Sequence, residues 1–310
     1  MITYQQAIKE QEDIEQLCAA KTPSNFEVYA PNNNYGFASI LKAYSGYPRN
    51  KAIMGVIPHA IYLHDAGIFP GELNCSLPAV LNYPEFRSTI WKKLAKKKQI
   101  IPSASPFLYA LRLFKPEVKE KEKKGTLYFP PHSTALVTMS FNQELLIKQL
   151  NDLPEHLKPI TVCVHWHDVT LNLHQFFQSH GFKVVSAGHM YDENFIFRWL
   201  HLVSAFKYTM GGNVSSPLFY SVSAGTPHFL IDSQFEYEEH ESFQAYSTQN
   251  NPYSKRASFR LKRIWQLFSA FTETITEEQK ELVNYCMGYA YRKKSDALLK
   301  QLQLIQSETV

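Results

Sequence analysis

The chain has 310 residues, of which 45% are hydrophobic and 14% are aromatic, and its formal net charge is +4. This composition can fill a core, which excludes a disordered chain, and the length favours two domains. The mild charge argues against a nucleic-acid-binding protein, which would carry a far more basic surface. The four cysteines form no CxxC pair, the polar N-terminus carries no apolar signal segment, and no apolar run is long enough to span a membrane. These features predict a cytoplasmic protein.

The first part of the chain predicts a smaller α/β domain, residues 1–118. Short apolar runs predict strands, and longer runs with apolar residues at helical spacing predict helices between them. The expected strands are residues 26–30, 51–57 and 99–105, and the expected helices are residues 36–46 and 86–97. An almost wholly charged segment, residues 115–125, follows and is typical of a solvated linker.

The second part alternates strands and helices regularly and predicts a second α/β domain, residues 119–250. The strands are short unbroken apolar runs, as expected where both faces of a parallel sheet are buried. They are expected to begin at residues 126, 160, 183, 207 and 228. Helices are expected at residues 142–154, 171–182, 193–206 and 215–224. Five strands in a row with helices between them predict a doubly wound parallel sheet.

Residues 251–310 are predicted to be helical. One helix is expected over residues 255–271 and another over residues 276–305, the latter starting with a capping box at Thr276. The predicted fold class is therefore α/β, with two Rossmann-like α/β/α domains, parallel sheets, and C-terminal helices that pack back on the first domain.

Four consecutive predicted strands end in histidines, hydroxyl residues or glycines, although the strands themselves are aliphatic. Ligands bind beyond the carboxyl ends of parallel strands, so these residues are expected to form one site. The expected binding residues are His132, Ser133, Thr134, His165, His167, Gly188, His189, Gly211, Gly212, Asn213, Ser215 and Ser216. A helix start preceded by glycines suits a phosphate, because backbone N–H groups can approach it closely. An ordinary capped helix after a tight turn is the simpler alternative.

Two common nucleotide-binding motifs are missing from the sequence. It has no GxGxxG fingerprint followed by a suitably spaced acidic residue, and it has no P-loop lysine. Their absence argues against a dinucleotide cofactor and against a kinase or ATPase. We therefore expect no cofactor and a substrate that contains phosphate.

The stretch "GGNVSSPLFYSVSAGTPHFLI", residues 211–231, carries a family resemblance. Its Gly/Ser-rich turn, its helix ending in Gly-Thr-Pro and its short strand make residues 125–232 similar to the donor-binding half of GT-B glycosyltransferases. The resemblance is to enzymes of bacterial surface-polysaccharide and lipopolysaccharide synthesis. Residues 55–69 loosely resemble their acceptor-facing loop, and residues 100–110 resemble the strand before their interdomain crossing.

This resemblance implies metal-independent transfer of a sugar from a UDP-, GDP- or CMP-linked donor to a surface-glycan or lipid-linked acceptor. The acceptor hydroxyl must lose a proton, and Asp65 or His64 is the expected general base, with His59 as the next candidate. His132, Ser215, Ser216 and the helix dipole are expected to stabilise the leaving phosphate. The simpler interpretation is that His64 and Asp65 only cap a turn before Gly67.

The stretch "HWHD" supports an alternative, a metal-dependent hydrolase. His165, His167 and Asp168 match the start of a metal cluster, and two histidines one residue apart on a strand can share a zinc ion. The pattern breaks at Val169 and Thr170. Further alternatives are a pyruvyl-type transfer and a non-catalytic sugar-nucleotide-binding protein. Basic residues within 92–98 and 256–265 are either solvated or bind anionic lipid at the inner membrane face.

Overall fold

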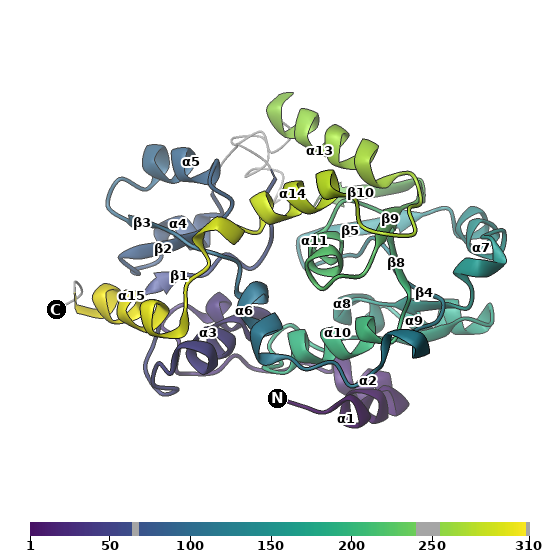
Figure 1. Cartoon of the computed structure of the whole chain (residues 1–310), viewed down its shortest axis with the longest axis horizontal. Coiled ribbons are helices and arrows are strands. Elements are labelled where there is room, and N and C mark those ends of the chain that lie inside the picture. Colours follow the sequence, from purple (N-terminus) through teal and green to yellow (C-terminus); the bar gives the residue numbers. More distant parts are fainter. Residues whose placement is uncertain (64–67, 240–254, 308–310) are drawn as a thin grey trace.

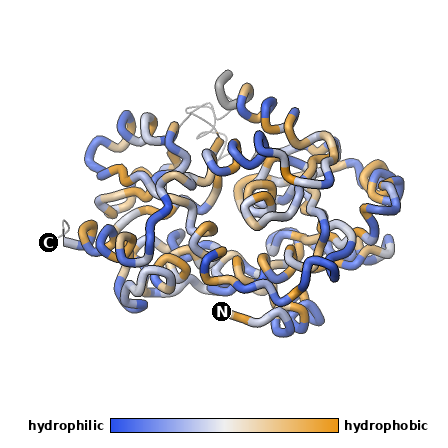
Figure 2. The backbone as a smooth tube through the Cα atoms, viewed as in Figure 1, coloured by the Kyte–Doolittle hydropathy of each residue, from blue (hydrophilic) through white to orange (hydrophobic). Residues whose placement is uncertain are grey.

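The computed structural model describes residues 1–63, 68–239 and 255–307. Within these residues the chain forms a three-stranded and a five-stranded parallel sheet, together with a two-stranded antiparallel ribbon. The two parallel sheets lie on opposite sides of the molecule, each with its own helices (Figure 1). Hydrophobic stretches occur in both halves (Figure 2). The predicted α/β class with two parallel sheets is confirmed.

The N-terminal residues form short helices that precede the first sheet. They are α1 (Tyr4–Lys9), η1 (Glu10–Asp13) and α2 (Ile14–Cys18). These helices pack against α8 and α10 of the second half (defined below), and Glu10 Oε2 accepts a hydrogen bond from Arg198 Nε at 2.6 Å. The start of the chain therefore packs on helices that belong to the larger sheet.

The three-stranded sheet has the order β1-β2-β3 and is accompanied by helices. The strands are β1 (Gly55–Val56), β2 (Ala79–Asn82) and β3 (Gln99–Pro102). The helices are η2 (Ala30–Gly36), α3 (Phe37–Ser45), α4 (Pro70–Asn74), α5 (Arg87–Leu94) and α6 (Pro106–Leu113). Strands 51–57 and 99–105 were predicted too long, and β2 was not predicted.

The predicted strand at residues 26–30 is wrong, because a side chain occupies the hydrogen-bonding groups that a strand would need. Asn32 Nδ2 donates to the Gly55 carbonyl at 3.0 Å, and Asn32 Oδ1 accepts from Ile57 N at 2.9 Å. This buried amide therefore bonds the backbone of β1 and its neighbour, and the chain enters η2 at Ala30 instead of extending.

The five-stranded sheet has the order β7-β6-β4-β8-β9, so its first strand lies at the centre. Its strands are β4 (Thr126–Phe129), β6 (Ile160–Cys163), β7 (Lys183–Val185), β8 (Tyr208–Gly211) and β9 (His228–Leu230). The connecting helices are α7 (Gln143–Asn151), α8 (Trp166–Thr170), α9 (Leu173–Ser179), α10 (Phe195–Ser204) and α11 (Ser216–Ser223). The five predicted strands and the helices predicted between them are confirmed. In a sheet of this Rossmann-type order, a crevice is expected where the strand order reverses, beside β4.

An antiparallel ribbon of β5 (Val137–Phe141) and β10 (Phe235–Glu239) was not predicted. Both strands carry several exposed polar residues, so neither forms the unbroken apolar run that identified the other strands. Shorter 3-10 turns are η3 (Glu120–Glu122) within the charged linker and η4 (Glu155–Leu157) before β6.

The C-terminal helices cross both halves, as the yellow ribbon in Figure 1 shows. They are α13 (Lys255–Phe268), α14 (Glu277–Cys286), η5 (Tyr289–Tyr291) and α15 (Ser295–Ser307). The single helix predicted over residues 276–305 is broken at Gly288, whose φ is 67°. The predicted capping box at Thr276 is present, and α15 packs on α3 of the first half. No helix among the described residues meets the length and hydropathy needed to cross a membrane.

Candidate functional site

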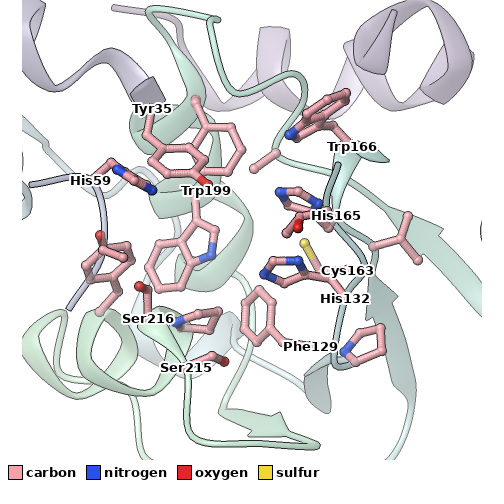
Figure 3. A pocket seen from close by; sticks show the side chains of 18 of the residues that line it. Tyr35, His59, Phe129, His132, Cys163, His165, Trp166, Trp199, Ser215 and Ser216 are labelled. Carbon is pink, nitrogen blue, oxygen red and sulfur yellow. The ribbon is translucent and has the colours of Figure 1, made fainter. Parts of the chain in front are cut away.

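A cavity of about 330 Å³ lies beside the carboxyl ends of β4 and β6, between the two halves of the molecule. Its volume is within the range of small-molecule binding sites. The second half contributes Phe129, Pro130, His132, Thr134, Cys163, Val164, His165, Trp166, Ala187, Phe195, Trp199, Ser215, Ser216, Pro217 and Tyr220. The first half contributes Tyr35, His59, Ala60 and Ile61. Figure 3 shows His59 on one wall and the His132–His165 pair on the opposite wall.

The cavity brings together six of the residues predicted from the sequence: His59, His132, Thr134, His165, Ser215 and Ser216. The other predicted binding residues do not line it: Ser133, His167, Gly188, His189, Gly211, Gly212 and Asn213. The first two candidates for general base, His64 and Asp65, lie outside the described residues. The strand-end rule therefore identified the position of the cavity but only part of its lining.

His132 and His165 form a stacked pair, with ring centroids 4.1 Å apart. Burial lowers the pKa of both rings, and that of His165 falls well below 6.5, chiefly through burial and further through the neighbouring histidines. Both rings are therefore neutral at pH 7. His132 Nδ1 lies 3.1 Å from the Ser133 carbonyl, which only accepts, so Nδ1 carries the proton and Nε2 is an acceptor. Both nitrogens of His165 are buried and lack a partner among the described residues, so they are free to bond a ligand.

Asp168 holds the loop that carries His132. Asp168 Oδ1 accepts a hydrogen bond from Ser133 N at 3.0 Å, and Ser133 Oγ accepts one from Met139 N at 3.0 Å. Burial raises the pKa of Asp168 to about 6, against the lowering effect of its bonds to Ser133. The last residue of the HWHD stretch therefore shapes the cavity wall.

The position predicted for His165 and His167 on a strand is wrong. β6 ends at Cys163, His165 is the N-cap of α8, and His167 lies within that helix. The side chains consequently do not share one face of a strand. Among residues 1–63, 68–239 and 255–307, no group of three or more histidine, cysteine, aspartate or glutamate side chains is arranged to hold a metal ion.

The start of α11 faces the cavity with two serines. Ser215 is the N-cap and makes no side-chain capping bond, while Pro217 occupies the first turn. The predicted helix start is thus confirmed to within one residue. Backbone N–H groups in the first turn of a helix have no intrahelical partner, and together with the helix dipole they favour an anion. This wall can therefore receive a phosphate.

Close packing against other parts of the protein explains why glycine occupies three positions that were predicted to bind phosphate. A Cβ at Gly212 would lie 2.5 Å from both Pro131 Cδ and Ser233 Oγ, and one at Gly211 would lie 3.0 Å from His228 Nε2. Gly188 has a φ of 90° and packs against Arg198 and Leu17. The close neighbours of these glycines are protein atoms, and none of the three lines the cavity.

We expect Gly212→Ala to lower the free energy of unfolding by about 1–3 kcal/mol, because the added methyl group overpacks a closed site. Gly71→Ala is the matched control, since its nearest contact would be an ordinary 3.4 Å to Tyr29 Oη. Urea denaturation of both variants measures the difference. Equal stability of the two variants would contradict this explanation of Gly212.

The remaining predicted polar residues have partners away from the cavity. His189 Nδ1 accepts from Tyr191 N at 3.1 Å, and its ring centroid lies 4.3 Å from that of Trp166. Asn213 Nδ2 donates to Tyr237 Oη at 2.8 Å. His189 therefore supports the ring of Trp166, which does line the cavity.

The aromatic lining was not predicted from the sequence. Trp199 stacks on Phe129 with ring centroids 5.7 Å apart, and Trp166, Tyr35 and Phe195 add further aromatic surface. Phe129, Phe195 and Trp199 lie in apolar runs that indicate core positions. Tyr35 and Trp166 belong to no motif that marks an aromatic ring as facing a ligand. No lysine, arginine, aspartate or glutamate is among the described residues that line the cavity. The described lining is therefore neutral, aromatic and rich in imidazole.

Comparisons with known proteins show structural likeness that is weak. No protein-family model matches the chain, and no curated protein matches it. Among solved structures, the wall teichoic acid polymerase TagF is similar over 74% of this chain, with 12% sequence identity and a TM-score of 0.35. The match covers 57% of the TagF chain, so this protein spans little more than half of that structure.

Proposed function

We propose that the protein is a metal-independent glycosyltransferase that moves a sugar from a nucleotide-sugar donor to a surface-glycan or lipid-linked acceptor. The observation that carries the proposal is the cavity between two parallel α/β halves. A helix start with Ser215 and Ser216 forms part of one half's wall, and His59 of the other half faces the His132–His165 pair. With a lipid-linked acceptor, the protein acts at the inner membrane face.

The donor is proposed to bind on the wall formed by the second half. Its phosphate accepts hydrogen bonds from the first turn of α11 and from the two serines. His165 can donate to the same phosphate, because neither of its nitrogens has a partner in the described structure. His132 presents Nε2 as an acceptor, which suits a sugar hydroxyl, and the aromatic rings supply flat surfaces for the sugar or the base.

The acceptor is proposed to enter beside His59. Burial lowers the pKa of His59 to about 4, so the imidazole is neutral at pH 7 and can accept the proton of an attacking hydroxyl. The phosphate leaves toward α11, whose dipole stabilises the developing charge. His64 and Asp65 stay predicted alternatives for the base.

A metal ion has no assigned part in this scheme, because hydroxyl, imidazole and backbone N–H groups meet the phosphate. Transfer is expected to continue at an unchanged rate in EDTA. Stoichiometric zinc in the purified protein, together with loss of activity in EDTA, would instead support the metal-dependent hydrolase. Nucleotide-sugar binding with no consumption of donor would support the non-catalytic binding protein.

A thermal-shift panel of CMP, UDP, GDP and dTDP tests the proposed donor. A nucleotide at about one hundred times its Kd is expected to stabilise the fold by about 2.7 kcal/mol, which raises Tm. One nucleotide should raise Tm well above the others, because the base and the phosphate number both affect fit. No shift with any nucleotide would contradict the proposal.

Ser216→Ala is expected to weaken binding of that nucleotide by about tenfold or more, because a hydrogen bond to a charged phosphate contributes about 1.5–3 kcal/mol. Ser223→Ala, at the other end of α11 and outside the cavity lining, is the matched control and should bind as wild type does. Calorimetric titration of both variants measures the difference. If Ser216→Ala binds the nucleotide with wild-type affinity, the Ser216 hydroxyl does not contact the phosphate.

A further inference from the structure

Behind His59 lies a chain of buried polar side chains that leads away from the cavity. Tyr62 Oη lies 3.3 Å from His59 Nδ1 and 3.2 Å from Glu72 Oε1. Tyr62 follows β1, and Glu72 lies on α4, where its side chain is only 2% exposed. Neither residue lines the cavity, so His59 is the only member of this chain that a ligand can reach from the described part of the site.

The number of protons that these three side chains carry determines which of them donates each hydrogen bond. A carboxylate only accepts hydrogen bonds, so the single Tyr62 proton is donated to Glu72. The phenol oxygen then accepts from His59, which requires the imidazole proton to be on Nδ1. Nε2 is left with its lone pair. This tautomer is the one that a general base needs if Nε2 meets the substrate.

We propose that Tyr62 and Glu72 are positioning residues that hold His59 in the Nδ1–H tautomer and stabilise the imidazolium formed during the reaction. With Glu72 ionised, the tautomer follows from the hydrogen bonds. The catalytic consequence rests on the proposed function. When His59 Nε2 takes the acceptor proton, the positive charge on the ring lies two hydrogen bonds from the Glu72 carboxylate.

The protonation state of Glu72 controls the direction of the chain. The described groups that face Glu72 are Tyr62, Arg87, Tyr29 and Tyr83. Burial raises the pKa of Glu72 to about 7, although Arg87 and the Tyr62 hydrogen bond act to lower it. The pKa values of the three tyrosines are raised, so these groups are neutral near pH 7. Glu72 is therefore the group that changes charge in this pH range.

Protonation of Glu72 reverses the direction of the hydrogen bonds between Glu72, Tyr62 and His59. The carboxylic acid then donates to Tyr62, the Tyr62 proton turns toward His59 Nδ1, and the imidazole proton moves to Nε2 through solvent in the cavity. One proton has been added to the three residues, and His59 stays neutral. In this state Nε2 is a donor and cannot act as the base.

Nitrogen NMR of protein labelled with ¹⁵N-histidine tests the proposal directly. The His59 signals are identified as those missing from His59→Gln. At pH 8.5 the wild type should show a protonated Nδ1 and an unprotonated Nε2, and at pH 6 the proton should be on Nε2. Tyr62→Phe should show no preference for Nδ1–H at either pH.

Two variants separate the proposed chain from a general effect of pH. Glu72→Gln should abolish the change of tautomer between pH 6 and pH 8.5, because the amide does not titrate. Tyr29→Phe is the matched control, since Tyr29 faces Glu72 without contacting His59, and it should change tautomer as wild type does. A wild-type tautomer on Nε2 at pH 8.5, or an unchanged tautomer in Tyr62→Phe, overturns the proposal.

Turnover measurements distinguish failure of the chain from failure of the proposed function. In an active glycosyltransferase, Tyr62→Phe should lower kcat with little change in donor KM, and Glu72→Gln should remove the acid limb of the pH–rate profile. The expected NMR result without consumption of any nucleotide sugar would confirm the tautomer and contradict the proposed function. An unaltered kcat in Tyr62→Phe, in an active enzyme, would overturn the catalytic part of this inference.

Discussion

His59→Gln is expected to lower kcat by about 10²- to 10⁴-fold, the usual contribution of a general base. Glutamine keeps a polar group near the position of the ring but cannot take a proton from the acceptor hydroxyl. Because this interaction is made only in the transition state, kcat and kcat/KM for the donor should fall together. Initial rates of nucleotide release, measured over a range of donor concentrations, provide both parameters.

The matched control for this substitution is His180→Gln, which changes an exposed histidine at the end of α9. It should retain the wild-type rate. If His59→Gln also retains it while the wild type consumes donor, the base lies elsewhere. His64→Gln and Asp65→Asn then become the variants to compare.

On acidification to pH 4.5, His228→Asn is expected to lose about 2.7 kcal/mol less unfolding free energy than the wild type loses. His228 is buried in β9, with Nδ1 2.9 Å from Thr209 Oγ1, and burial lowers its pKa to about 3. A neutral buried histidine stabilises the fold fully above the unfolded pKa of 6.5, and this stability is lost as the pH falls toward 3. At pH 4.5, about two pH units below the unfolded value, the loss is about 2.7 kcal/mol at 1.36 kcal/mol per unit.

The measurement is the difference in unfolding free energy between wild type and variant, taken by urea denaturation at pH 7.5 and pH 4.5. Variants are compared because Glu72 and Asp168, whose pKa values are raised to about 7 and about 6, contribute in the opposite direction. His228→Asn should gain on wild type by about 2.7 kcal/mol on acidification. The exposed His180→Asn should follow wild type, and identical behaviour of the two variants would contradict the argument.

The five-stranded sheet of the second half could be predicted from the sequence because its strands are buried on both faces. Strands such as Ile160–Cys163 then consist of unbroken apolar residues, and the next helix begins at recognisable capping residues such as Ser215. The first half gave weaker signals. β2 has only four residues. The segment at residues 26–30 has a strand-like composition, but the Asn32 side chain, and not this segment, makes the hydrogen bonds to the backbone of Gly55 and Ile57.

The sequence predicted only those residues of the candidate site that directly follow the end of a strand or begin the next helix. His132, His165, Ser215 and Ser216 line the cavity because the carboxyl ends of neighbouring strands meet there. The Glu72–Tyr62–His59 chain could not be predicted, because hydrogen bonds between α4 and the loop after β1 depend on tertiary structure. The glycines were predicted to allow a ligand to approach, whereas protein neighbours occupy the space beside Gly212.

A crystal structure of the protein with the nucleotide that raises Tm most tests the central claim directly. The account predicts a phosphate within hydrogen-bonding distance of Ser216 and the first turn of α11, with His59 facing the position of the transferred sugar. A nucleotide bound outside the cavity lined by His59, His132 and Ser216 would contradict the proposed site.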